Sequence, residues 1–318
     1  MISFLEQMSS LYSTIFGVFG YIILGFILKK INIIPDYITN KFNFICFNIL
    51  LPIALISNFW RIKFPEIILF ELLLVFFGSG IIIFIIGFFF SKKIFNFKTD
   101  DSALFGLGSC FGNSVAFGIP LMYSILGPIN SMPYMVLVLF HGLIHFTYAT
   151  LIIEGYRNRE ETNFLKLFKI IIGLLKNIVL FGMFIGILLN YLEIPLPNSL
   201  NIFLLPISKI ALPAVLISLG FSLAGFKIMS EIRYSIILTI LKNFLFPCIA
   251  FVLAKFIFVM PNQLVFIITT AAALPSGSQT YYFSYRYNSL QKIISSNIVL
   301  STFVSFFTIS FIFLLFGY

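Results

Sequence analysis

The sequence predicts an all-α, polytopic membrane protein of ten transmembrane helices, arranged as two inverted five-helix repeats. Three observations lead to this fold class. First, 60% of the residues are apolar and only 10% are Asp, Glu, Lys or Arg, against roughly 45–50% and about 25% in soluble domains. Second, apolar runs of membrane-crossing length recur along the chain. Third, two of these runs contain a proline break, at similar places in the two halves.

The apolar runs define ten predicted spans, since a helix needs ~20 apolar residues to cross the bilayer. Short charged or Pro- and Asn-containing connections separate the runs, and the longest extends from Glu154 to Lys176. A soluble domain needs about 50 residues or more, so no connection can hold one. In order, the predicted spans are Leu11–Leu28, Asn43–Trp60, Glu66–Phe90, Ser102–Leu126, Pro133–Ile153, Asn177–Leu192, Ser199–Gly225, Arg233–Phe258, Gln263–Tyr287 and Ile294–Phe316.

The first span is expected to remain in the mature protein. Lys29 and Lys30 follow it and no basic residue precedes it, which is the reverse of the order in a secretory signal. The cysteines Cys46, Cys110 and Cys248 fall inside spans without a partner nearby in sequence. This pattern indicates neither a disulfide framework nor a zinc site, and we expect no cofactor and no metal ion.

Basic residues set the predicted orientation, because cytoplasmic loops retain Lys and Arg. With both termini outside, the outer connections contain only Arg61, Lys63 and Lys255. The formal charge of +9 then faces anionic lipid, and no nucleic-acid partner is needed to explain it. We expect a multi-pass protein of the cell (inner) membrane. The residues assigned to the cytoplasmic side are Lys29, Lys30, Lys41, Lys92, Lys93, Lys98, Arg157, Arg159, Lys166, Lys169, Lys176, Lys227, Arg233, Arg286 and Lys292.

Three sequence landmarks recur at nearly one offset and predict an internal repeat. Because each repeat has an odd number of spans, the second must lie upside down relative to the first, so that the broken spans 4 and 9 cross near mid-membrane. We predict repeats at residues 1–160 and 161–318, with breaks at Gly118–Pro120 and Leu274–Gly277. The landmark pairs are Phe19-Gly20…Gly25 with Phe181-Gly182…Gly186 (181 − 19 = 162), Leu51-Pro52 with Leu212-Pro213 (212 − 51 = 161), and Pro120 with Pro275 (275 − 120 = 155).

The residues around both breaks resemble a known family. Gly112-Asn113-Ser114-Val115-Ala116-Phe117-Gly118-Ile119-Pro120-Leu121 is similar to the fourth-span signature of the auxin efflux carrier family. Ala271–Gly277, continuing to Tyr287-Asn288, resembles its ninth-span counterpart. Further matches bring the resemblance to essentially the whole chain; they are Leu51-Pro52, Leu212-Pro213 with Gly220, and Ser301-Thr302.

The resemblance implies ten spans in two inverted repeats, divided between a transport domain and a scaffold domain. Family members include plant auxin exporters and bacterial carriers assigned to malonate and other small organic acids. Two features depart from the family pattern. Asn177 is followed by Ile178 where Pro is frequent, and the stretch from Glu154 to Lys176 replaces the long central loop of plant members. The chain therefore resembles the short bacterial carriers, and auxin is not the expected substrate.

Candidate substrate-binding residues gather at the two breaks. Asn113 offers a neutral donor and acceptor suited to a carboxylate or an ion, and the resemblance implies that the matching Asn contacts substrate. The alternative is that Asn113 only satisfies loosened backbone groups. Polar residues after Pro275 form an equivalent edge in the second half, or else cap the restarting helix. The candidates at the breaks are Asn113, Ser114, Gly118, Pro120, Pro275, Ser276, Ser278 and Gln279, with both prolines given mainly architectural roles.

Lys209 and Lys242 are basic residues well within predicted spans. A charge at the bilayer centre costs ~2.5–3.5 kcal/mol on insertion scales, so both are candidates for substrate binding. Snorkelling toward an interface is the alternative for each. His141 and His145 share one face of the fifth span, where polar packing and a proton relay both fit; two His without a third ligand do not make a metal site.

The predicted function is secondary transport of a small organic anion, such as a mono- or dicarboxylate. No Asp lies inside a span, which argues against a cation antiporter. Na⁺-coupled symport of another small solute, and a non-transporting ligand sensor, stay open. Intramembrane hydrolases need Ser/His, paired Asp or metal-helix constellations, which are not recognisable, so no enzyme is expected. H⁺ and Na⁺ are the candidate coupling ions, and a homodimer is one candidate assembly.

Overall fold

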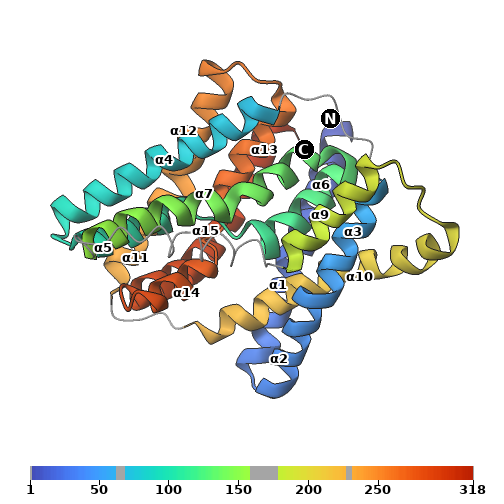
Figure 1. Cartoon of the computed structure of the whole chain (residues 1–318), viewed down its shortest axis with the longest axis horizontal. Helices are drawn as coiled ribbons and strands as arrows, with labels where there is room; N and C mark the ends of the chain where they lie inside the picture. Colours follow the sequence, from blue (N-terminus) through green and yellow to red (C-terminus); the bar gives the residue numbers. More distant parts are fainter. Residues whose placement is uncertain (1, 62–68, 158–177, 227–230, 318) are drawn as a thin grey trace. The chain divides into compact units, whose positions relative to one another are not determined.

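The computed structural model describes residues 2–61, 69–157, 178–226 and 231–317, and helices make up most of these ranges (Figure 1). No strand occurs in these ranges. The helices are α1 (Ile2–Lys30), α2 (Asp36–Ile45), η1 (Cys46–Leu50), α3 (Leu51–Arg61), α4 (Leu69–Ile94), α5 (Thr99–Cys110), η2 (Ser114–Gly118), α6 (Ile119–Asn130), α7 (Met132–Arg157), α9 (Ile178–Tyr191), α10 (Asn198–Gly225), α11 (Ile232–Ile240), η3 (Leu241–Leu245), α12 (Phe246–Val252), η4 (Leu253–Ile257), α13 (Asn262–Ala273), α14 (Gln279–Arg286) and α15 (Gln291–Phe316).

The helices form two compact units that interleave along the chain. The first, here called the α1–α10 unit, contains α1, α2, α3, α6, α9 and α10. The second, the crossover unit, contains α4, α5, α7 and α11 to α15. Each unit therefore contains helices from both halves of the chain. The assignment of residues 1–160 and 161–318 to two inverted repeats stays a prediction.

Close helix packing holds the α1–α10 unit together. Its most extensive contacts join α1 with α10 and α3 with α9, and Figure 1 shows α3 and α9 side by side. Gly25 of α1 and Gly220 of α10 lie against each other's helix backbone. Such small residues let membrane helices approach closely, which is how they pack without a hydrophobic driving force. The indole Nε1 of Trp60 also donates to the carbonyl of Ile194 at 2.7 Å.

The crossover unit packs α4 on α5, α12 on α13, and α11 on α15. An ion pair links Arg157 at the end of α7 to Asp100 at the start of α5, with 2.7 Å between Nη2 and Oδ2. The same Arg157 nitrogen donates to the carbonyl of Tyr287, just after α14, at 2.9 Å. One guanidinium therefore joins the ends of three helices.

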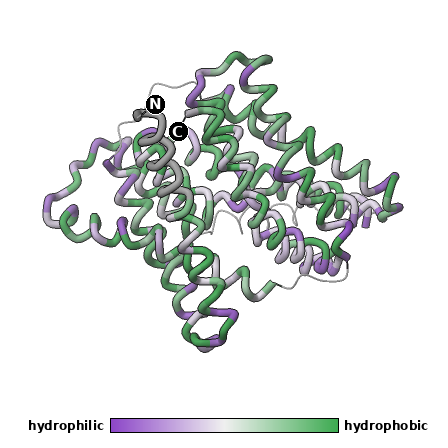
Figure 2. Tube along the Cα trace, turned by 180° about the vertical axis from the view of Figure 1, so that it is seen from behind, coloured by the Kyte–Doolittle hydropathy of each residue, from purple (hydrophilic) through white to green (hydrophobic). Residues whose placement is uncertain are grey.

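Six helices among the described residues are long and apolar enough to cross a membrane. They are Asp36–Arg61, Phe70–Ile94, Met132–Arg157, Asn198–Gly225, Ile232–Ile257 and Gln291–Phe316. Figure 2 shows that hydrophobic residues dominate the helices. The protein is thus a multi-pass membrane protein. The ten-span count stays a prediction, and the connection from Glu154 to Lys176 lies mostly outside the described residues.

The predicted break at Gly118–Pro120 is wrong. Helical turns run from Ser114 through η2 into α6, and Pro120 occupies the first turn of α6. Proline has no N–H for the helical ladder, and the π-helical turn η2 ends two residues before it. The break lies instead at Phe111–Asn113, between α5 and η2. The second break is close to its predicted place, because α13 ends at Ala273 and α14 begins at Gln279.

Candidate functional site

The two breaks meet inside the crossover unit. Gly112 and Ser276 form an isolated antiparallel bridge. The Asn113 N–H donates to the Pro275 carbonyl at 2.7 Å, and the Gly277 N–H donates to the Phe111 carbonyl at 3.1 Å. Lipid cannot satisfy the backbone groups that a helix break frees. Each break therefore supplies the hydrogen bonds that the other lacks.

Local sequence explains where the second break begins. A proline disfavours helical geometry in the residue before it, and Leu274 accordingly adopts φ −55° and ψ 148° at the end of α13. Gly277 then passes very close to the first break. A Cβ on Gly277 would lie 2.7 Å from ring carbons of Phe111 and 2.9 Å from the Gly112 carbonyl oxygen. Only glycine fits at this point of the crossover.

Replacing Gly277 by alanine is therefore expected to disrupt the paired breaks and to abolish transport. Gly112 provides a matched control, because a Cβ there would have its nearest neighbour, Leu274 Cβ, at 3.4 Å, which is ordinary contact. Uptake into proteoliposomes and thermal stability in detergent should be compared for Gly277→Ala and Gly112→Ala. Equal behaviour of the two variants would contradict the close approach at Gly277.

Asn113 and Ser114 lie at the first break with different hydrogen-bonding states. The Asn113 side chain is buried, and its Oδ1 has no hydrogen-bond partner among the described residues. The Ser114 N–H donates to the Gly112 carbonyl at 2.9 Å, and the Ser114 carbonyl accepts from the Tyr134 hydroxyl at 2.6 Å. A buried polar group without a partner is rare. Asn113 is therefore the group at this break that a ligand could satisfy.

Side chains of α15 hold Ser276 at the second break. The Ser276 N–H donates to Ser301 Oγ at 2.9 Å, and Ser276 Oγ accepts from Asn297 Nδ2 at 2.7 Å. The hydroxyl of Thr239 in turn donates to Asn297 Oδ1 at 2.8 Å. Asn297 is not among the residues that the sequence predicts for the site. Ser301, one helical turn further along α15, belongs to the family resemblance.

Ser278 and Gln279 stand at the start of α14. Ser278 occupies the N-cap position, but its side chain makes no cap hydrogen bond, so the capping interpretation is wrong for this residue. Ser278 is half-buried and Gln279 is exposed. The first turn of α14 therefore begins beside the break without a side-chain cap, and helix N-termini of this kind carry a partial positive charge.

Lys242 and Asn243 cap the C-terminal end of α13. Lys242 is fully buried, and its Nζ donates to the Ala272 carbonyl at 2.6 Å. Asn243 Nδ2 donates to the Ala273 carbonyl at 3.2 Å. The π-helical turn η3 that carries both residues ends two residues before Pro247. Proline has no N–H for the helical ladder, and such π-bulges are frequent at functional sites. The snorkelling alternative is wrong for Lys242.

Lys242 also lies close to the first break. A Cβ on Gly112 would be 3.6 Å from Lys242 Nζ. The ammonium further stands 5.0 Å from the ring centre of Phe246, within the range of a cation–π contact. No carboxylate among the described residues forms an ion pair with Lys242. The crossover thus contains a buried lysine whose partners among the described residues are neutral.

Three predicted site residues lie outside this cluster. Gly118, Pro120 and Lys209 belong to the α1–α10 unit. Pro120 is buried in α6, and its carbonyl accepts from the Ser124 hydroxyl at 2.8 Å. Lys209 is exposed on α10. The roles of these three residues stay predictions.

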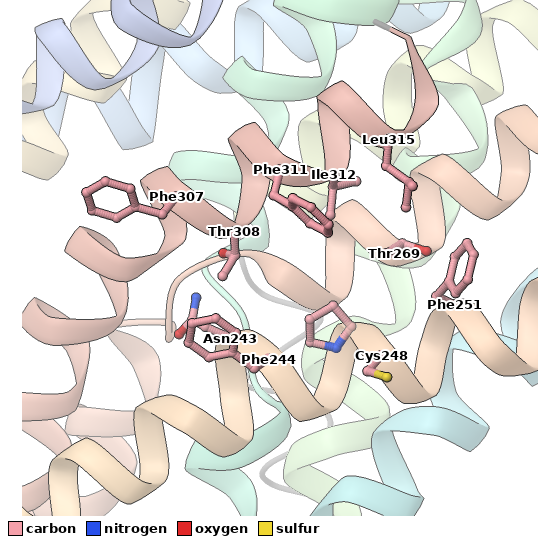
Figure 3. Close-up of a pocket in the computed structure, with 11 residues that line it drawn as sticks. Asn243, Phe244, Cys248, Phe251, Thr269, Phe307, Thr308, Phe311, Ile312 and Leu315 are labelled. Carbon is pink, nitrogen blue, oxygen red and sulfur yellow. The ribbon is translucent and has the colours of Figure 1, made fainter.

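A cavity of about 510 Å³ opens elsewhere on the crossover unit (Figure 3). Residues of α12 and α15 flank it, and Phe244, Phe311 and Leu315 in its lining are exposed. Apart from Asn243, it includes none of the residues at the breaks. An apolar, outward-facing lining is what a surface in contact with lipid chains presents, so we do not assign the substrate site here.

Comparison with known proteins identifies the family to which the chain belongs. No curated protein compared with the chain matches it. The family model described as membrane transport protein matches residues 10–313, a range that includes both breaks and both units. Within the described residues, no group of three or more His, Cys, Asp or Glu could hold a metal ion. The chain belongs to the membrane transport protein family, the auxin efflux carrier family that its two break sequences resemble.

Proposed function

We propose that the protein is a secondary carrier that moves a small organic anion, a mono- or dicarboxylate, across the inner membrane with both termini outside. The substrate binds at the paired breaks of the crossover unit, and this unit serves as the transport domain. The α1–α10 unit serves as the scaffold. The division of the chain into two compact units supports these roles.

The buried ammonium of Lys242 carries the proposal. Removing a charge from water costs several kcal/mol unless an opposite charge or strong hydrogen bonds compensate. Lys242 has one backbone acceptor, the Ala272 carbonyl, and no ion pair with a described residue. An anionic substrate would supply the missing opposite charge.

The helix ends at the crossover do not offset the charge of Lys242. Each helix end is equivalent to roughly half an elementary charge, positive at the N-terminus and negative at the C-terminus. The C-terminal ends of α5 and α13 and the N-terminal ends at Ser114 and Gln279 meet there, so their contributions nearly cancel. Lys242 then leaves about one net positive charge. This balance matches a ligand with one carboxylate near the ammonium.

Asn113 can serve an anion or a cation. Turning the amide presents Nδ2 as a donor to a carboxylate, whereas Oδ1 would accept from a donor or bind Na⁺. The unpartnered Oδ1 is therefore a specific observation in favour of the second candidate function, Na⁺-coupled symport. Replacement of Asn113 by Asp and by Ala separates the two, because the Asp variant keeps the oxygen and adds negative charge.

For an anion carrier, both Asn113→Asp and Asn113→Ala should abolish or sharply reduce uptake, with Asp at least as harmful because it repels the carboxylate. For a Na⁺ symporter, Asn113→Asp should retain Na⁺-dependent uptake while Asn113→Ala loses it. Initial uptake rates of both variants at matched abundance provide the measurement. Wild-type rates in Asn113→Ala would remove this residue from the site.

The function itself is tested by uptake of labelled acetate, pyruvate, malonate and succinate into proteoliposomes under imposed Na⁺ and pH gradients. Saturable uptake of at least one acid, lost in Lys242→Met, is the expected result. Binding of an acid without uptake under any gradient would indicate a sensor. Neither binding nor uptake of any acid would overturn the proposal.

A further inference from the structure

His141 is bonded directly to the first break. The Gly112 N–H donates to His141 Nε2 at 3.2 Å, and the His141 side chain is only 3% exposed. A ring nitrogen that accepts a hydrogen bond carries no proton, so the proton of the neutral imidazole must be on Nδ1. The backbone of the break is thus held by the neutral form of His141.

His145 has no such connection. Its Nδ1–H donates to the His141 carbonyl at 2.8 Å, and its Nε2 has no partner among the described residues. The two rings lie 4.5 Å apart. His145 therefore packs beside His141 in α7 but makes no hydrogen bond to either break, which makes it a natural control for experiments on His141.

The described groups around His141 include another basic residue and no carboxylate, so protonation of His141 is favoured when an anion binds nearby. Lys242 from η3 faces the same glycine, Gly112, from another side. Apart from Lys242, the nearby titratable groups are Cys110 at the end of α5 and, on α7, His145 and Tyr148; α4 contributes the ring of Phe76. Among these groups no carboxylate is present. A second cation beside Lys242 therefore requires an anion to balance it.

We propose that His141 is the proton-binding residue that couples H⁺ to the anion, an inference that rests on the proposed function. One proton binds Nε2 and converts it from an acceptor into a donor. The Gly112 N–H loses its acceptor at the same moment. The Gly112 N–H and the His141 Nε2–H, which replace one donor–acceptor pair, are then two donors that face the break. A carboxylate accepts from both. When the anion leaves, the proton leaves with it and the bond between Gly112 and His141 forms again.

Thermodynamic linkage fixes the direction of the coupling. If the anion favours protonated His141, protonation must favour anion binding by the same factor. Proton and anion therefore bind together, and the carrier is expected to act as an H⁺–anion symporter. Protonation without an anion leaves two cations side by side, which disfavours the state that would leak protons.

The chain contains two histidines, so ¹⁵N-histidine labelling gives two imidazoles that His145→Gln assigns. In lipid nanodiscs, His141 should carry its proton on Nδ1 at high pH, and Nε2 should become protonated as the pH falls. The amide signal of ¹⁵N-labelled Gly112 should shift over the same pH range in wild type but not in His141→Gln. Malonate or pyruvate should move the transition to higher pH.

Transport gives a readout that a purely structural role would not affect. An imposed inward proton gradient should stimulate uptake by wild type and by His145→Gln. His141→Gln keeps an acceptor oxygen for Gly112 but cannot take up the proton. This variant should exchange labelled for unlabelled anion more slowly than wild type at equal pH, because one donor to the carboxylate is lost, and its stimulation by the gradient should fall to a ratio near one.

Three results would overturn the inference: a proton on His141 Nε2 at high pH, a Gly112 amide that does not respond, or normal gradient stimulation of His141→Gln. Each leaves the proposed function intact if anions are still transported. A protein that neither binds nor moves any anion would remove the proposed function and the coupling with it.

Discussion

Replacing Gly220 by alanine is expected to destabilise the α1–α10 unit strongly. A Cβ on Gly220 would overlap the Ile22 carbonyl oxygen and lie 2.7 Å from the Phe26 nitrogen. Both are backbone atoms, so no side-chain rotation can make room, and α1 must move away from α10. Overpacking costs typically about 1–3 kcal/mol, which outweighs the ~1 kcal/mol that alanine gains over glycine in a helix. Gly25→Ala should act in the same way, since its Cβ would overlap the Ile217 carbonyl oxygen.

Gly20 of α1 and Gly225 of α10 provide controls on the same two helices. A Cβ on either would meet no atom within 4 Å, so Gly20→Ala and Gly225→Ala should be neutral or slightly stabilising. The measurement is thermal unfolding of all four variants in one detergent. The readout is the amount of protein that stays monodisperse as the temperature rises. Equal stability of the two pairs would show that α1 and α10 do not touch at Gly25 and Gly220.

Replacing Lys242 by methionine is expected to eliminate high-affinity transport while the protein still folds. Methionine retains much of the side-chain volume, and exchanging a buried charge for an apolar residue is often neutral for stability. A hydrogen bond to a charged group contributes about 1.5–3 kcal/mol. Its loss should raise the apparent KM for the anion roughly 10- to 150-fold, at tenfold per 1.4 kcal/mol.

Lys255→Met is the matched control on the same apolar segment, Ile232–Ile257. Lys255 lies in η4, where its Nζ donates to Asn262 Oδ1 at 2.7 Å in an exposed position. The control should retain wild-type uptake. Concentration dependence of initial uptake at matched abundance provides the measurement. An unchanged apparent KM in Lys242→Met would exclude the ammonium as the counter-charge of the substrate.

A dicarboxylate and a monocarboxylate test how many charges the site compensates. If Lys242 supplies the single net positive charge at the crossover, its loss should weaken both substrates to a similar extent. In the H⁺-coupled mechanism proposed above, protonated His141 is a second cation at the crossover and would hold the second carboxylate. Lys209 was predicted as a substrate-binding residue, but it is exposed and belongs to the α1–α10 unit, so its contribution stays a prediction.

The sequence by itself determined the class of the protein and named several residues of the candidate site. The charge-poor composition and the recurring apolar runs predict a membrane protein, because helices of that length cross the bilayer with their backbone groups satisfied internally. The family model over residues 10–313 confirms the resemblance that the break sequences indicate. Asn113, Ser276 and Lys242 were named from local sequence alone, and all three lie in the crossover unit.

Only the tertiary structure decided where the first break lies. Proline is a local signal, and Pro120 pointed to a break that is in fact the first turn of α6. The true break at Phe111–Asn113 is stabilised by bonds to Pro275, Gly277 and His141. These partners are far away in sequence, so no local pattern contains them.

The same physical reason separates the two lysines and the two histidines. Hydropathy places Lys209 and Lys242 alike inside apolar segments, and helical spacing places His141 and His145 on one face of α7. Their environments depend on which helices pack against them. Lys242 meets the end of α13 and His141 meets the backbone of Gly112, whereas Lys209 is exposed and His145 bonds within its own helix. Sequence determines which side chains are available, and long-range packing decides which of them reach the crossover.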